Sequence, residues 1–241
     1  MNKISVFLEN WGTQLHSTFI EQERYKWLIE GLSNTLIITL GALVIGVALG
    51  TVIAMIKYFS QDKKFSLAAK ICDIYVTTIR GIPVVVLLII FYYLILKSSE
   101  GVVVGIVTFG LNSAAYMAEL IRSGINAVDP GQLEAGRSLG LSKLQTVNRI
   151  ILPQAVKNIL PAIGNEFIAL LKETSVAGYV AVKDLTRAGN LIRNNTFDAF
   201  NPLIAVAIVY LVLVIIITAV LGKFERRLSG SDRGKKPKKK L

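Results

Sequence analysis

Three polar side chains, Arg80, Asn112 and Glu166, stand inside long apolar stretches of the sequence. A buried carboxylate can bind an ammonium group, a guanidinium can bind a carboxylate, and an amide can bond either kind of group. Ionisable groups are costly inside a bilayer, so they usually face a cavity or a partner. We therefore take these three residues as candidates for binding a small polar solute within a membrane.

Helical rise gives the depth of each group in its apolar stretch. At about 1.5 Å per residue, Arg80 lies about 18 Å and Glu166 about 15 Å from the inner start of their stretches. Asn112 lies about 17 Å from the outer start of its stretch by the same rise. All three fall near the bilayer midplane, where a transport site is expected.

The same residues also allow purely structural roles. Arg80 can pair with Glu166 and hold two helices together, or it can pair with Asp73, two helical turns away on its own stretch. Alternatively, Arg80 can orient Glu166 towards a solute. We expect Gly81 and Pro83 to kink or unwind the helix that carries Arg80 rather than to touch a solute.

The composition indicates an all-α, polytopic membrane protein. Of the 241 residues, 53% are hydrophobic and 18% are charged, and the mean hydropathy is +0.56. The single cysteine, Cys72, excludes an internal disulfide and a cysteine-cluster metal site. We predict five membrane-spanning helices, each long enough to cross a bilayer, over residues 31–56, 68–96, 101–123, 156–182 and 199–222.

The Lys and Arg residues predict the orientation and the domain limits. With the N terminus outside, the cytoplasmic segments hold 18 of the 27 basic residues, which favours this orientation and a cytoplasmic C terminus. We divide the chain into an amphipathic interfacial segment (1–30), a transmembrane domain (31–227) and a basic tail (228–241). The net charge of +11 lies largely in these cytoplasmic segments without any base-reading module, which argues against nucleic acid as a partner.

One polar segment, residues 129–153, carries two consecutive helix-start signals. Asp129 can cap a short helix with Pro130 at its first position, and Gly140 follows its end. Ser142 can then cap a second short helix, with Gln145 completing a capping box, and Pro153 limits its continuation. The segment is predicted to form a compact cytoplasmic knob of two helices.

The spacing within this knob resembles the EAA loop of ABC-importer permeases. The loop pattern is Glu-Ala-Ala, three residues, Gly, nine residues, then Ile-x-Leu-Pro, and only the third position departs from it here. That position is Gly136, in place of Ala. The matching positions and the neighbouring leucine are Glu134, Ala135, Gly140, Leu141, Ile150, Leu152 and Pro153. Further matches to the polar-amino-acid branch, the histidine, glutamine and arginine permeases, are residues 80–83, 112–121 and 164–167.

This resemblance implies an ABC type I importer permease fold and a set of partners. In such permeases the EAA loop is a coupling element that docks on a separate ATPase, and a span-three Asn and a span-four Glu, here Asn112 and Glu166, are thought to hold the amino acid. The implied partners are an ATP-binding-cassette ATPase homodimer, a second permease chain that is identical or homologous, an extracytoplasmic amino-acid-binding protein, and the lipid of a bacterial cell membrane. The outer loop 183–198 is the expected contact for the binding protein.

No phosphate-binding loop with GxxxxGK[ST] spacing and no triad or metal-ligand set is present in the sequence. We therefore expect neither ATP hydrolysis nor a cofactor in this chain, with ATP and Mg²⁺ held by the partner ATPase. Two alternatives stay open: the same type of permease for another small polar solute, and an ion-coupled secondary transporter. The second alternative requires an internal repeat, and the five stretches contain none. A non-transporting membrane anchor leaves the midplane charges unexplained.

Overall fold

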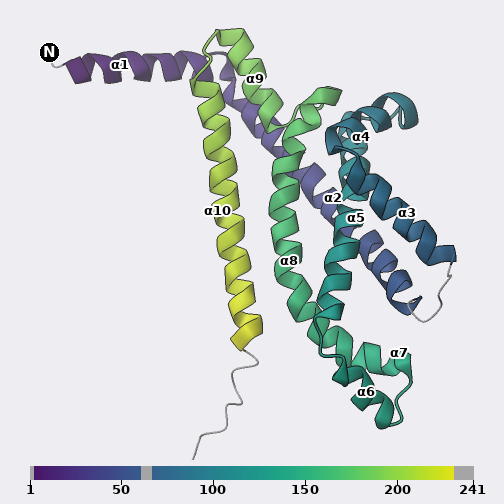
Figure 1. The fold of residues 1–241 in the computed structure, drawn as a ribbon. Coiled ribbons are helices and arrows are strands. Elements are labelled where there is room, and N and C mark those ends of the chain that lie inside the picture. The colour runs from purple at the N-terminus through teal and green to yellow at the C-terminus, as the bar shows by residue number, and fades with distance from the viewer. Residues whose placement is uncertain (1–2, 61–66, 231–241) are drawn as a thin grey trace, which may run out of the picture. The chain divides into compact units, whose positions relative to one another are not determined.

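The computed structural model describes residues 3–60 and 67–230, and every regular element in these ranges is a helix (Figure 1). Most of the predicted basic tail therefore lies outside the described residues, as does the segment 61–66. The helices along the chain are α1 (Lys3–Leu15), α2 (Tyr25–Phe59), α3 (Leu67–Gly81), α4 (Val84–Ile90), α5 (Gly101–Asn126), α6 (Gly131–Ser138), α7 (Lys143–Thr146), α8 (Leu152–Glu173), α9 (Leu185–Thr196) and α10 (Asn201–Gly230).

Three of the five predicted spans are single long helices. α2, α5 and α10 are each long and apolar enough to cross a membrane. α2 begins at Tyr25, ahead of the predicted start at residue 31. The all-helical, multispan class predicted from composition is confirmed by these elements.

The second predicted span is interrupted at Gly81–Pro83. Pro83 has an extended backbone (φ −56°, ψ 134°) and opens α4, which continues into a π-helical turn, Phe91–Ile95. Proline has no N–H to continue a helix, and it drives the residue before it out of the helical region. The expected kink or unwinding at Gly81 and Pro83 is confirmed, and α3 and the helix that begins at Val84 are bent by 104° at this break.

The fourth predicted span also differs from a single α-helix. α8 ends at Glu173, and the chain continues as a 3₁₀ helix, Thr174–Val180. Among the described helices, α8 is not one that is long and apolar enough to count as a span by itself. Its charged side chains and the amides within it lower its hydropathy, namely Lys157, Glu166, Lys172 and Glu173 with Gln154, Asn158 and Asn165. By length and composition the described residues hold three spans, or four if α3 and the helix beginning at Val84 count as one, so the predicted five are not confirmed.

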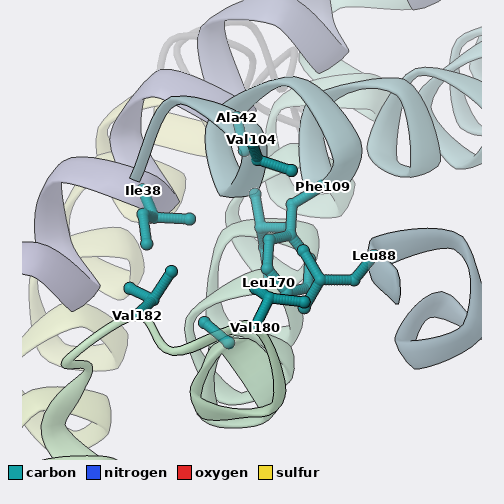
Figure 2. Close-up of a cluster of buried hydrophobic side chains, with 9 residues drawn as sticks. Ile38, Ala42, Leu88, Val104, Phe109, Leu170, Val180 and Val182 are labelled. Atoms are coloured by element: carbon teal, nitrogen blue, oxygen red, sulfur yellow. The ribbon is translucent and has the colours of Figure 1, made fainter. Parts of the chain in front are cut away.

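The chain folds into two compact units, and α2, α5, α8 and α10 each contribute to both. The first unit contains the described residues of Met1–Val44, Ile82–Gly110 and Leu170–Leu213. Its core is a cluster of nine buried apolar side chains, in which Phe109, Leu170 and Leu88 lie together (Figure 2). Lipid tails are as apolar as such a core, so the cluster stabilises the unit through close van der Waals packing more than through exclusion of water.

The second unit contains the described residues of Ile45–Gly81, Leu111–Ala169 and Val214–Leu241. Here α2 and α5 approach closely through small residues. A Cβ atom added at Gly46 would lie 2.6 Å from Ser113 Oγ, and one added at Gly50 would lie 2.5 Å from Met117 Cβ. Gly46 and Gly50 thus permit a close helix contact, which fixes the part of α5 that carries the candidate site.

Candidate transport site and coupling loop

Glu166 is held by a side chain of α5. The Ser113 hydroxyl, which is fully buried, donates a hydrogen bond to Glu166 Oε1 at 3.0 Å. Ser113 lies next to Asn112, whose side chain is also buried, at 4% exposure. A single hydrogen bond satisfies only part of a carboxylate, which can accept about four, so Glu166 keeps oxygen lone pairs for another donor.

Arg80 lies against the same part of α5. Its guanidinium carbon is 4.9 Å from the centroid of the Tyr116 ring, within the range of a cation–π interaction. Ser113 and Tyr116 are three residues apart on α5, so their side chains are neighbours on the helix surface. Ser113 and Tyr116, on one turn of α5, therefore hold a carboxylate from α8 and a guanidinium from α3 at the second unit's candidate site.

Neither structural pairing considered for Arg80 is present. Among the described residues, Arg80 forms no ion pair with Glu166 and none with Asp73. Asp73 instead accepts from Lys57, with 2.8 Å between Lys57 Nζ and Asp73 Oδ1. All three candidate residues thus lie in the second unit, and whether they contact a solute stays a prediction.

A further group of charges in the second unit was not identified from the sequence. Lys57 Nζ lies 2.8 Å from Glu119 Oε1 as well as from Asp73, and Arg122 donates to Glu119 Oε2 at 2.6 Å. The four side chains come from α2, α3 and α5 and make one connected network. Part of this network could have been predicted, because Glu119 and Arg122 are charges three residues apart inside a predicted span. The contribution of Lys57 could not, because it lies 62 positions from Glu119.

The predicted knob at residues 129–153 begins as the sequence indicates. Pro130 has helical dihedral angles ahead of α6, and the Asp129 carboxylate accepts from the Gly131 N–H at 2.8 Å. At the other end, Gly140 has φ +83°, and its N–H donates to the Arg137 carbonyl while the Leu141 N–H donates to the Gly136 carbonyl. This pair of bonds is the Schellman motif, which ends the helix at a left-handed residue.

The second knob helix is also capped as predicted, but it is not short. Ser142 and Gln145 form the reciprocal capping box of α7. The chain then continues through a π-helical turn, Val147–Ile151, directly into α8, so the prediction that Pro153 ends this helix is wrong. The wider i→i+5 turn just before Pro153, closed by the Leu152 N–H on the Val147 carbonyl, accommodates the missing donor and the ring.

Gly136, the one departure from the loop pattern, is packed against α7. A Cβ atom there would lie 2.4 Å from Thr146 Cγ2, so the glycine is what lets the two knob helices touch. Thr146 itself is fully buried and donates to the Ser142 carbonyl. Glu134 and Ala135 are exposed on α6, Leu139 and Leu144 are exposed at 80% and 57%, and Ile150, Leu152 and Pro153 continue the segment. Figure 1 shows α6 and α7 side by side next to the ends of α5 and α8.

An all-helical chain with membrane-length helices, polar groups within them and a helical knob has the features of a membrane transport subunit. Residues 43–230 match the family described as "Binding-protein-dependent transport system inner membrane component", and the chain belongs to this family. It is therefore an inner-membrane permease subunit of an ABC importer, with an ATPase and a substrate-binding protein as implied partners. Proteins of this kind are not enzymes themselves.

Relatives and solved structures agree with this family. The chain is 37% identical over 210 residues to the arginine transport system permease protein ArtQ of Bacillus subtilis (strain 168), covering 86% of this chain and 94% of that protein. It is 35% identical over 211 residues to the putative glutamine transport system permease protein GlnP of Rickettsia bellii (strain RML369-C), covering 84% and 93%. A structure described as "Crystal structure of an amino acid ABC transporter with histidines" matches with a TM-score of 0.79 and 38% identity, over 87% of this chain and 98% of that one. The type I importer permease fold expected from the EAA loop is confirmed.

Proposed function

We propose that this chain moves a polar amino acid into the cell as one of two permease chains that line a single pathway. The amino-acid class of cargo follows the arginine and glutamine permeases to which the chain is similar. A homodimeric ATPase supplies the energy, and an extracytoplasmic binding protein supplies the solute. The second permease chain is identical or homologous, because the few spans of one chain make a poor pore.

The contacts of Glu166 from α8 and Arg80 from α3 with one turn of α5 support the proposal most directly. Through Ser113 and Tyr116 that turn holds an anionic and a cationic group that do not neutralise each other. An amino acid carries the complementary pair, an ammonium and a carboxylate. We assign the ammonium to Glu166, the carboxylate to Arg80, and further hydrogen bonds of the amino acid to Asn112.

The knob supports the proposed coupling to the ATPase. Its fold is fixed by local caps, so its exposed groups, among them Glu134, Leu139 and Leu144, form a preorganised surface for a partner. ATP and Mg²⁺ bind on that partner, and nucleotide-driven closure shifts the permease pair between inward-open and outward-open states. We place the knob and the C terminus in the cytoplasm and the N terminus outside a bacterial cell membrane, in accord with the distribution of Lys and Arg. In this orientation α9 faces the binding protein.

Uptake by the reconstituted complex in vesicles tests the proposal. Accumulation of a labelled amino acid should require ATP and the ATPase subunit, and it should survive ionophores that collapse proton and sodium gradients. A panel of small polar solutes in the same assay separates an amino-acid permease from one for another cargo. Gradient-driven uptake without any ATPase would favour an ion-coupled secondary transporter instead.

A further inference from the structure

A cavity of about 530 Å³ lies within the second unit beside the candidate site. Helices α2, α3 and α5 all contribute to its wall. Its polar lining consists of Lys57, Asp73, Thr77, Arg80, Tyr116 and Glu119. Two of these side chains are cationic and two are anionic, so the distribution of charge along the wall decides which solutes the cavity suits.

The two carboxylates of the cavity already have counterions. Lys57 Nζ lies 2.8 Å from both Asp73 and Glu119, and Arg122 bonds the other oxygen of Glu119. The side chain of Lys57 is only 17% exposed, which reduces the screening of its two pairs by solvent. Together the two acids and two bases carry no net charge, so they offer a cationic solute no uncompensated negative charge.

Arg80 is the uncompensated charge of the cavity. Its guanidinium lies over the Tyr116 ring, and within residues 3–60 and 67–230 it has no carboxylate partner. A planar guanidinium forms two parallel hydrogen bonds with a carboxylate, and stacking on an aromatic ring restricts its orientation beforehand. The cavity therefore favours a solute that brings a carboxylate.

We propose that this permease selects amino acids without a net positive charge. The proposal rests on the function given above, in which Arg80 takes the carboxylate and Glu166 takes the ammonium. A neutral zwitterion such as glutamine uses both groups. A cationic amino acid such as arginine brings a second positive charge for which the cavity has no uncompensated carboxylate, because Lys57 and Arg122 already balance Asp73 and Glu119. Lys57, which lines the cavity, thus determines charge selectivity by balancing these two carboxylates.

Binding to the purified permease–ATPase complex, without the binding protein, tests this selectivity. Labelled glutamine is displaced by unlabelled glutamine, arginine or glutaminamide, which lacks the carboxylate and is a cation. Glutaminamide should compete at least about tenfold more weakly than glutamine, the size expected for loss of a charge-assisted hydrogen bond. Arginine keeps its carboxylate, but its side-chain charge finds no uncompensated carboxylate in the cavity, so it should also compete about tenfold more weakly. In the Arg80→Gln complex, the advantage of glutamine over glutaminamide should disappear.

Lys57→Gln tests the selectivity role directly. The change leaves Asp73 without its counterion, while Arg122 still holds Glu119, and should raise the affinity for arginine relative to glutamine by about tenfold. Lys70→Gln is the matched control, since it removes the same charge from an exposed position on α3 that does not line the cavity. This control should leave the ratio unchanged.

The outcomes separate the selectivity from the proposed function. If glutamine binds but arginine and glutaminamide compete equally well in the wild-type complex, the selectivity is overturned and amino-acid transport stands. An unchanged ratio in an assembled Lys57→Gln complex would overturn the role of Lys57. If that variant does not assemble, competition in the wild-type complex decides the selectivity by itself. The Lys57→Arg complex, which keeps the charge, must then retain the wild-type ratio of arginine to glutamine affinity, and a changed ratio would overturn the role of Lys57. If no amino acid binds and none is taken up with ATP, the proposed function fails and the selectivity fails with it.

Discussion

The Ser113 hydroxyl donates to Glu166 Oε1 at 3.0 Å, and this bond ties α8 to the buried face of α5. Ser113 is fixed in turn by Gly46 of α2, because no side chain larger than hydrogen fits between them. Three helices of the second unit therefore determine where the Glu166 carboxylate lies. A carboxylate held this way has the fixed position that a binding site requires.

Glu166→Gln should weaken amino-acid binding while the complex still assembles. Glutamine keeps the size and hydrogen-bonding capacity of glutamate but removes the charge that would hold an ammonium. The expected loss is on the order of 1.5–3 kcal/mol, that of a charge-assisted hydrogen bond. Equilibrium binding and complex yield are measured together, with Glu225→Gln on the exposed end of α10 as the control.

A structural role for Glu166 predicts the reverse pattern. If the carboxylate served only to counter the charge of Arg80, which is exposed and forms no ion pair with it here, the single change would reduce assembly, and a double neutral variant at both positions would recover assembly and transport. Full transport by that double variant would end the assignment of a substrate role.

Gly46→Ala should lower substrate affinity through Ser113. The new Cβ would lie 2.6 Å from Ser113 Oγ, so the hydroxyl must move and its bond to Glu166 is lost. Gly41→Ala is the matched control, because it inserts the same methyl group on α2 against Ile106, at 2.9 Å, within the first unit. Both variants should lose about 1–3 kcal/mol of stability through overpacking. Only Gly46→Ala should also weaken binding, and equal affinities in the two variants would contradict the positioning role.

Glu134→Lys should uncouple transport without preventing insertion of the helices. The residue is exposed on α6, so its replacement changes the surface offered to the ATPase and not the fold of the knob. Gly140→Pro should have the same effect by another route, because φ +83° is inaccessible to proline and the Schellman end of α6 would be lost. Co-purification of the ATPase and uptake in vesicles are measured, with Glu225→Lys as a charge-reversal control. Normal uptake by both variants would rule out a coupling role for this knob.

Acid should loosen the contact between the N-terminal segment and the start of α10. Burial acts to raise the pKa of the Asp198 carboxyl, but hydrogen bonds from Asn201, Thr18 and the Phe200 N–H outweigh it and hold the pKa below its ordinary value. A carboxyl with a lowered pKa in the folded state stabilises the fold above its unfolded pKa, about 3.9, and loses this contribution as the pH falls through the folded pKa. The melting temperature should therefore drop on acidification more in the wild type than in Asp198→Asn.

Asp184 supplies a control of opposite sign. This carboxyl is fully buried, and burial raises its pKa, although the N–H groups of Thr186 and Arg187 that it caps partly oppose the shift. Its contribution to stability is present at low pH and is lost as the pH rises through the folded pKa. Raising the pH to neutral should therefore lower the melting temperature less in Asp184→Asn, which has no carboxyl at this position, than in the wild type. If both variants respond to pH in the same direction, these hydrogen bonds do not determine the two titrations.

The sequence alone determined the local features of this protein. The caps of the knob, the left-handed end at Gly140 and the break at Pro83 depend on residues within a few positions of each other, so their chemistry can be recognised from spacing. Hydropathy likewise located α2, α5 and α10, because an apolar run of this length is typical of a membrane-spanning helix. The midplane positions of Asn112 and Glu166 were estimated from the same apolar runs and the helical rise, and they stay a prediction.

The spacing of residues predicted helix ends less well where the outcome depends on the packing of neighbouring helices. Pro153 was expected to end a helix, yet a π-helical turn before it lets the helix continue into α8. The apolar stretch 156–182 was expected to be one helix, yet its outer end forms a 3₁₀ helix. Both outcomes depend on how the surrounding helices pack, which a short stretch of sequence does not specify.

Only the tertiary structure decided which charged groups meet. Ser113 and Glu166 are 53 positions apart, and Lys57 and Glu119 are 62 apart, so no local pattern links them. The rotation of each helix about its axis selects the face it turns to its neighbour, and close approach at Gly46 and Gly50 sets that rotation for α2 and α5. Arg80 thus stacks on Tyr116 of α5 instead of pairing with Asp73, which lies two turns away on the same helix, α3. The Asp73 carboxylate pairs with Lys57 of α2 instead.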